Sequence, residues 1–214
     1  MTSNIEFFFD PVCPFAWLTS RWAVEVSEHS DLDVEWRFIS LLYVNEDHDM
    51  PEHYRAGHRI GLRLLRIAAA VREDHGNAGV AALYTAFGTK IHTEGISREL
   101  FSADGDADTS FVVEALAVAG MAASYADAAA DDARDGLIRS ETELALSRTG
   151  PGVGTPIITY DLERPATSTF FGPVINRIPR GEEALELWDA LVTLARIPGV
   201  SELKRSLRGD LDFS

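Results

Sequence analysis

The sequence contains a single cysteine, Cys13, in 214 residues. One thiol cannot form a disulfide within the chain, and this excludes the disulfide framework of small secreted proteins. No basic segment precedes an apolar stretch at the N-terminus, so a signal peptide is not expected. No apolar run is long enough for a transmembrane helix. We therefore expect a cytoplasmic protein that does not enter the membrane.

Basic residues are also scarce. The chain has 19 lysine and arginine residues against 34 aspartate and glutamate residues, which gives a net charge of −15. This balance disfavours nucleic acid and anionic membranes as partners, because both attract positive charge. Hydrophobic residues make up 46% of the chain, as is ordinary for a globular protein. The length suits one large domain or a small fold with an insertion.

The N-terminal part of the chain predicts a strand, a helix and a second strand. Residues 5–9 form a short aromatic run typical of a buried strand. Pro14 suits the first position of a helix, with Cys13 as the residue that precedes it. Residues 33–40 then alternate apolar and polar side chains, the pattern of a half-buried strand. This order indicates a parallel β-α-β unit.

The middle of the chain predicts helices only. From about residue 51 to 147 the strand pattern is absent, and apolar residues recur at helical spacing. Residues 124–147 are rich in alanine and predict a helix that Gly136 weakens. The breaker cluster at 149–154 ends this block. Three apolar stripes carry the prediction: Ile60, Leu64, Ile67 and Val71; Val80, Leu83, Tyr84, Phe87 and Ile91; and Phe111, Ala115, Leu116 and Ala119.

The C-terminal part predicts two more strands and a last helix. Strands are expected over about residues 156–160 and 167–171, with a turn over 161–165 between them. The last helix is expected to begin near Arg180, with Trp188 on its apolar face. Leu185 and Trp188 would support a homodimer if they were exposed, but packing in the core explains the same residues.

Cys13 lies between a predicted strand and a predicted helix. A thiolate is the reactive form of cysteine, and the free N–H groups of a helix N-terminus stabilise it. Such placement can lower a cysteine pKa from about 8.5 to roughly 3.5–7.5. The competing interpretation is a buried, inert side chain, the common fate of a free cysteine.

Several segments together resemble the thioredoxin fold in its DsbA-like form, and more closely the mycothiol-dependent oxidoreductases that include mycothiol-dependent nitroreductases. The resemblance runs through nearly the whole chain. Its segments are residues 9–14 (Phe-Asp-Pro-Val-Cys-Pro), 19–22 (Thr-Ser-Arg-Trp), 90–92 (Lys-Ile-His), 153–156 (Val-Gly-Thr-Pro), 171–174 (Phe-Gly-Pro-Val) and 178–183 (Ile-Pro-Arg-Gly-Glu-Glu).

The resemblance implies an α/β, thioredoxin-like domain over residues 1–49 and 149–214, with an all-helical insertion over 50–148. It implies that Cys13, in the window Cys13-Pro14-Phe15-Ala16, is the attacking thiol. It also implies that Thr155-Pro156 is a loop with a cis proline that faces this thiol. Four further residues are candidate substrate contacts: Trp17, Tyr54, His92 and Gly154.

Two of these candidates have competing interpretations. His92 either lies over the thiol, where it tunes the thiol or donates a proton, or makes a structural hydrogen bond. Tyr54 and His58, at i and i+4 of a predicted helix, would line the same cleft. The histidines and carboxylates of residues 46–58 do not match a metal-ligand spacing, so a solvated stretch is expected there and no metal site.

The sequence departs from the resemblance at Ala16, where oxidoreductase members have a second cysteine. Three explanations stay open. The chain is a natural monothiol enzyme whose mixed disulfide an external thiol resolves, or Ala16 is an engineered substitution that traps this intermediate, or the protein has turned to a binding role.

The predicted function is thiol-disulfide exchange by a monothiol mechanism, through a mixed disulfide of Cys13 with a low-molecular-weight thiol such as mycothiol. We expect no tightly bound cofactor, a small-molecule thiol as co-substrate, and a small-molecule or protein disulfide as substrate. Two alternatives remain: a glutathione-transferase-kappa-like or isomerase enzyme that uses a bound thiol cofactor, and a non-catalytic DsbA-like binding protein.

Overall fold

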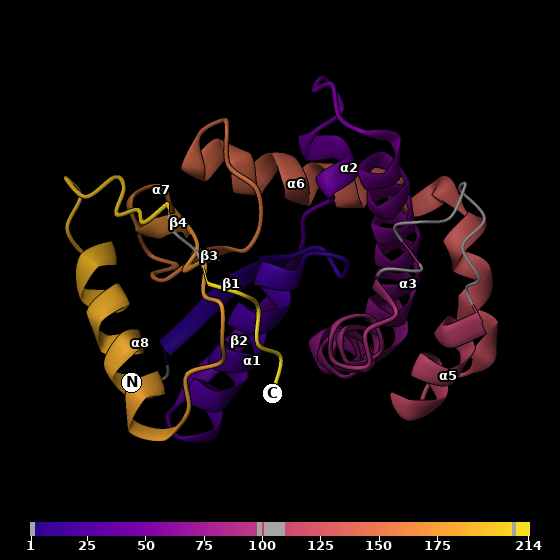
Figure 1. The fold of residues 1–214 in the computed structure, drawn as a ribbon, viewed down its shortest axis with the longest axis horizontal. Helices are drawn as coiled ribbons and strands as arrows, with labels where there is room; N and C mark the ends of the chain where they lie inside the picture. The colour runs from indigo at the N-terminus through magenta and orange to yellow at the C-terminus, as the bar shows by residue number, and fades with distance from the viewer. Residues whose placement is uncertain (1–2, 98–99, 101–109, 207–208) are drawn as a thin grey trace. The chain divides into compact units, whose positions relative to one another are not determined.

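A computed structural model describes residues 3–97, 100, 110–206 and 209–214 (Figure 1). The chain forms two compact units. The first comprises residues 1–9, 15–37 and 144–214, and the second comprises residues 10–14 and 38–143. Most of the predicted insertion lies in the second unit, and the predicted boundaries at residues 49/50 and 148/149 stay a prediction.

The first unit contains a four-stranded sheet with the order β2-β1-β3-β4. In this sheet β1 pairs antiparallel with β3, and β3 pairs antiparallel with β4. Phe7 lies opposite Ile158, and both side chains are fully buried. The strands are β1 (Ser3–Phe9), β2 (Leu32–Phe38), β3 (Ile157–Thr159) and β4 (Thr169–Phe171).

Two helices, α1 (Pro14–Glu28) and α8 (Gly181–Ala195), contribute to the core of this unit. The indole Nε1 of Trp22 in α1 donates a hydrogen bond of 3.0 Å to the carbonyl oxygen of Ala184 in α8. The ring of Trp188 lies 5.8 Å from that of Trp22 and 5.7 Å from that of Tyr160. Trp188 is therefore a core residue, whereas Leu185 is half-buried, and the homodimer stays a prediction.

The strand predicted over residues 167–171 begins two residues later than expected. Pro165 occupies the first position of a short helix, α7 (Pro165–Ser168), because its fixed φ favours a helical start. The Ser168 hydroxyl donates to the carbonyl of Arg164, and the Thr169 hydroxyl donates to that of Pro165. These side chains satisfy the carbonyls of the turn, so β4 can begin only at Thr169.

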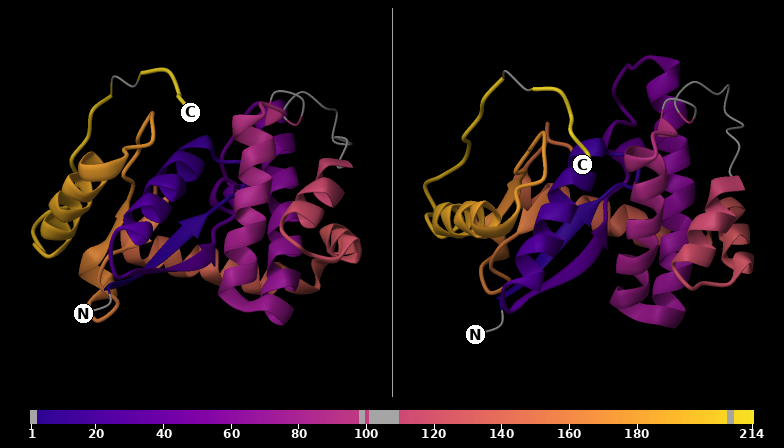
Figure 2. Two further views of the ribbon diagram at one scale, coloured as in Figure 1. Left: turned by 90° about the horizontal axis from the view of Figure 1, so that it is seen from below. Right: turned by 60° about the horizontal axis from the view of Figure 1, so that its bottom comes forward.

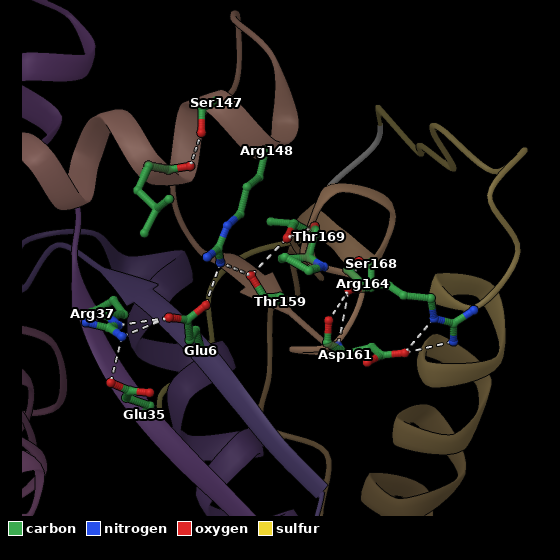
Figure 3. Close-up of polar contacts among 12 residues, drawn as sticks. Glu6, Glu35, Arg37, Ser147, Arg148, Thr159, Asp161, Arg164, Ser168 and Thr169 are labelled. Atoms are coloured by element: carbon green, nitrogen blue, oxygen red, sulfur yellow. Dashed lines mark hydrogen bonds and ion pairs between the residues drawn. The ribbon is translucent and has the colours of Figure 1, made fainter.

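A buried carboxylate, Glu6 of β1, joins several parts of the first unit (Figure 3). Its Oε1 accepts a hydrogen bond of 3.0 Å from Nε of Arg37, and its Oε2 accepts one from Arg148. Arg148 also donates to the hydroxyl of Thr159 at 2.9 Å, whereas Arg37 pairs with the more exposed Glu35. Glu6 thus balances two guanidinium groups.

The second unit is helical in every described element. Its longest helix, α3 (Glu52–Gly88), is interrupted at Gly76, whose φ of +63° favours glycine. A π-helical turn, η1 (Thr89–Thr93), follows it, and α5 (Ser110–Val118) lies beside α3 in both views of Figure 2. The predicted stripe residues of these helices are buried, apart from Ala119, which lies beyond the end of α5.

A short helix, α2 (Leu41–Val44), precedes α3. Within the described residues, no helix combines the length and the apolar character that a membrane crossing requires.

The helix predicted over residues 124–147 is broken. A 3-10 helix, η2 (Ala123–Ala130), ends at Asp131, which has an extended backbone conformation. The Asp131 carboxylate accepts the N–H of Ala133 and so caps a new start at η3 (Asp132–Arg134). The α-helix α6 (Asp135–Thr149) begins only after it and includes Gly136 in its first turn.

Candidate active site

The loop that carries Cys13 connects β1 to α1 and belongs to the second unit. The backbone N–H of Cys13 donates a hydrogen bond of 3.0 Å to the carbonyl of Asp10, which closes a tight turn. Pro14 is the first residue of α1, as predicted. Only 6% of Cys13 is exposed. The thiol therefore lies at a helix start in a turn of defined shape.

Asp10 is fully buried at the beginning of this turn. Its Oδ1 accepts the N–H of Val12 at 3.1 Å, and its Oδ2 accepts the N–H of Leu41, the first residue of α2, at 2.8 Å. Burial raises the pKa of Asp10 to about 7, although both hydrogen bonds oppose the rise. Asp10 was missed at the level of sequence; the signal was a carboxylate directly after the three phenylalanines of residues 7–9.

A glycine of α3 makes room for this carboxylate. A Cβ atom on Gly61 would lie 2.5 Å from Oδ1 of Asp10 and 3.0 Å from Cγ2 of Val12. Both distances are too short for an undisturbed contact. Helix α3 and the cysteine loop can therefore approach each other this closely only because residue 61 has no side chain.

His92, a predicted substrate contact, is held against the same loop. Its Nε2 lies 2.9 Å from the carbonyl oxygen of Pro11. A carbonyl can only accept, so Nε2 carries the proton and Nδ1 is the acceptor of the ring. Burial lowers the pKa of His92 to about 4, against the opposing effect of this bond. The structural hydrogen bond that the sequence left open is present, and the imidazole is neutral at neutral pH.

Tyr54 and His58 lie on the first turns of α3. Tyr54 is 51% exposed, and its ring lies 4.4 Å from that of His53. Nδ1 of His58 is buried and lacks a hydrogen-bond partner within the described chain, and burial lowers the pKa of this histidine. His58 precedes Gly61 by three positions, so both lie on one side of the helix. A role of Tyr54 in substrate binding stays a prediction.

The other residues predicted beside Cys13 belong to the first unit. Phe15 is half-buried, and Ala16 is fully buried in α1. Trp17 is 3% exposed, and the guanidinium carbon of Arg21 lies 4.3 Å from its ring centroid. Their predicted roles beside the thiol and in substrate binding stay predictions.

The Thr155-Pro156 loop also belongs to the first unit. Its peptide bond is cis, as the resemblance implied, and so is Gly172-Pro173. The Thr155 hydroxyl donates to the carbonyl of Phe8 in β1 at 3.0 Å, and the carbonyl of Pro156 accepts the N–H of Gly172 at 2.8 Å. These bonds fix the loop to the sheet beside β1. Gly154, the predicted substrate contact before it, is half-buried.

The cysteine turn has one thiol and two titratable groups close to it. One is an acid, Asp10, which begins the turn, and the other is a base, His92, which contacts it. Among the residues that the structure describes, no set of three histidine, cysteine, aspartate or glutamate side chains could hold a metal ion. The turn itself contributes one thiol, that of Cys13.

Comparison with known proteins gives one family and a consistent fold. A family model described as Rv2466c-like, mycothiol-dependent nitroreductase Rv2466c, matches residues 12–205. A Mycobacterium tuberculosis protein named Uncharacterized protein Rv2286c is 29% identical over 204 residues, which make up 95% of this chain and 82% of that protein. The crystal structure of the probable DsbA oxidoreductase SCO1869 from Streptomyces coelicolor is 18% identical, with a TM-score of 0.53, over 95% of this chain and 93% of that one. This similarity shows that the fold is thioredoxin-like with a helical insertion.

Proposed function

Because the chain belongs to the Rv2466c-like family of mycothiol-dependent nitroreductases, we propose that it is a cytoplasmic monothiol oxidoreductase. In this proposal Cys13 exchanges with disulfides of a low-molecular-weight thiol such as mycothiol. The co-substrate is a small thiol, and the substrate is a small-molecule or protein disulfide. The proposed exchange requires no resident cofactor, because each step forms one disulfide bond and breaks another, with no other oxidant or reductant.

The turn around Cys13 is the observation that carries this proposal. It places the thiol directly before Pro14, the first residue of α1, and the N–H groups of a helix start favour a thiolate. Asp10 and His92 hold the peptide group between Pro11 and Val12: Asp10 accepts its N–H, and His92 donates to its carbonyl. A helix start that is fixed in this way supports a role for Cys13 as nucleophile.

The exchange requires two steps. The Cys13 thiolate attacks one sulfur of a disulfide R–S–S–R; the bond Cys13–S–S–R forms, the original disulfide bond breaks, and R–S⁻ leaves. A second thiolate R′–S⁻ then attacks the R sulfur of the mixed disulfide, which gives R–S–S–R′ and restores the Cys13 thiolate. Because position 16 is alanine, the second thiol comes from outside the chain.

One observation favours a second candidate. Only 6% of Cys13 is exposed, and a buried thiol reacts slowly with disulfides. A glutathione-transferase-kappa-like enzyme would instead activate a bound thiol cofactor and would not need Cys13. Such an enzyme would keep its activity in the Cys13→Ser variant, and the monothiol enzyme would lose it.

The intact mass of the protein after incubation with mycothiol disulfide tests the proposal. We expect one mycothiol adduct on the native protein, its removal by free mycothiol, and no adduct on Cys13→Ser. Glutathione disulfide in a parallel sample reports whether the site selects the thiol. A parallel sample unfolded in urea is the control, because it shows whether the exposed Cys13 thiol can form the mycothiol adduct. A native protein without an adduct, beside an unfolded chain that forms one, would contradict the proposal.

A further inference from the structure

The turn from Asp10 to Pro14 is held by side-chain and backbone contacts from three helical elements of its own unit. The Asp10 carboxylate accepts the first N–H of α2, that of Leu41. Gly61 of α3 lies directly against Asp10 and Val12. His92 of η1 donates to the carbonyl of Pro11. Asp10 is also the residue whose backbone carbonyl accepts the N–H of Cys13.

The two hydrogen bonds of Asp10 require a carboxylate with both oxygens available. Oδ1 accepts from Val12 and Oδ2 accepts from Leu41. An amide has only one acceptor oxygen and would turn its NH2 donor toward one of these N–H groups, whereas protonation of the carboxyl weakens one of its two acceptor oxygens. In a fully buried position the amide leaves a backbone N–H without a partner, which is costly.

We propose that Asp10 is a positioning residue for Cys13, whose carboxylate fixes the Asp10–Pro14 turn to α2 and α3 and so sets the reactivity of the thiol. The inference rests on the proposed function, in which Cys13 is the nucleophile. Asp10 acts through the turn and makes no contact with the substrate. The packed neighbours that define its position are Leu41 and Gly61.

The charge of Asp10 changes in an accessible pH range. Its pKa is raised to about 7 by burial, and the other contributions come from the N–H groups of Leu41 and Val12. The titratable groups nearest to these contacts along the chain, Tyr43 on α2, His58 on α3 and His92 on η1, are not among the causes of the shift. The Asp10 carboxyl therefore changes its charge near neutral pH, whereas the pKa of His92, which also contacts the turn, is about 4.

Two variants remove the contact in different ways, and each has a matched control. Asp10→Asn removes the charge, and Gly61→Ala displaces the carboxylate without removing it. Glu141→Gln is the control for the first variant. Glu141 is also buried in this unit, accepts the N–H of Phe38 at 2.8 Å and pairs with Arg72, so this variant reports the effect of losing a buried charge other than that of Asp10. Gly79→Ala is the control for the second: it also lies in α3, and its Cβ would lie 2.5 Å from that of His75.

Hydrogen exchange at the amides of Val12 and Leu41 gives the first readout. We expect protection there to fall at least about tenfold further in Asp10→Asn than in Glu141→Gln, and at least about tenfold further in Gly61→Ala than in Gly79→Ala, as for the loss of a hydrogen bond to a charged group. Unchanged protection in both Asp10→Asn and Gly61→Ala would overturn the proposal. If Asp10→Asn does not fold, Gly61→Ala decides.

The pH dependence of Cys13 alkylation by iodoacetamide gives the second readout, which a merely structural role would not change. We expect two ionisations in the unmodified protein and in both controls, and one in Asp10→Asn. Identical profiles in Asp10→Asn and Glu141→Gln would overturn the proposal. Alkylation does not involve mycothiol, so a protein that forms no mycothiol adduct but shows these changes would contradict only the proposed function.

Discussion

Nε2 of His92 lies 2.9 Å from the carbonyl oxygen of Pro11, two residues before Cys13. This contact links η1 to the cysteine turn through a buried imidazole that is 5% exposed. The neutral ring makes this contact with the proton on Nε2. A second proton, on Nδ1, would give the ring a positive charge in a buried site, which is costly. The pKa of His92 is about 4 for this reason, with burial as the largest cause.

We predict that His92 makes the protein lose stability as the pH falls. The folded-state pKa of about 4 lies below the ordinary value of 6.5, so the stability that His92 contributes is complete above pH 6.5 and is lost as the pH falls toward 4. The full difference is about 3 kcal/mol. His92→Gln keeps a donor that can reach Pro11 but does not ionise. Urea unfolding of both proteins at pH 7, 5.5 and 4.5 measures the effect, and parallel pH profiles would contradict it.

We predict the opposite pH dependence for Asp10. Its folded-state pKa of about 7 lies above the ordinary value of 3.8. The folded protein therefore holds this proton more tightly, and the corresponding stability is complete below pH 3.8 and is lost as the pH rises through 7. The difference is about 4 kcal/mol at most. The free energy of unfolding of the unmodified protein, relative to that of Asp10→Asn, should rise as the pH falls from 8 to 5. A difference that stays constant over this range would show that Asp10 is ionised throughout.

Glu6 supports a prediction in the first unit. Glu6→Gln leaves Arg37 and Arg148 without their shared buried carboxylate (Figure 3). We expect a loss of about 3 kcal/mol in the free energy of unfolding, because one member of a buried ion pair is removed. The matched control is Glu35→Gln, since the Glu35 side chain is 47% exposed and pairs with the same Arg37. It should cost at most about 1 kcal/mol. Equal losses in the free energy of unfolding would show that Glu6 contributes no more to stability than the exposed Glu35.

The parts of the fold that sequence predicts are those set by local rules. The stripe from Ile60 to Val71 is buried because its spacing repeats with the helical turn. The start of α1 at Pro14 follows from the fixed φ of proline. The break at Asp131 is also local, but one side-chain cap outweighed the helical preference of the surrounding alanines.

The supports of the cysteine turn could not be predicted in the same way. Asp10 and Gly61 are far apart in the sequence, and their contact exists only after α3 has folded against the turn. Glycine in a helix usually signals weakness and not a close approach. His92 was identified from a resemblance to a family, and its hydrogen-bond partner, Pro11, became known only from the structure.

Ala16 supports a last prediction, on the resolution of the mixed disulfide. Ala16→Cys restores the spacing Cys-x-x-Cys, so the introduced thiolate can attack the Cys13 sulfur of the adduct: a disulfide forms between Cys13 and the introduced cysteine, the Cys13–S–S–R bond breaks, and R–S⁻ leaves. The protein with Ala16 should accumulate the mycothiol adduct. In Ala16→Cys we expect the disulfide form in its place, with a mass two hydrogen atoms lower than that of the reduced variant. Ala16→Ser, which is similar in size but cannot form a disulfide, should retain the adduct. The prediction would be contradicted by a stable adduct on Ala16→Cys whose introduced thiol can still be alkylated. That result would show that the first turn of α1 does not bring the two sulfurs together, so a second cysteine at position 16 would not be enough to resolve the mixed disulfide.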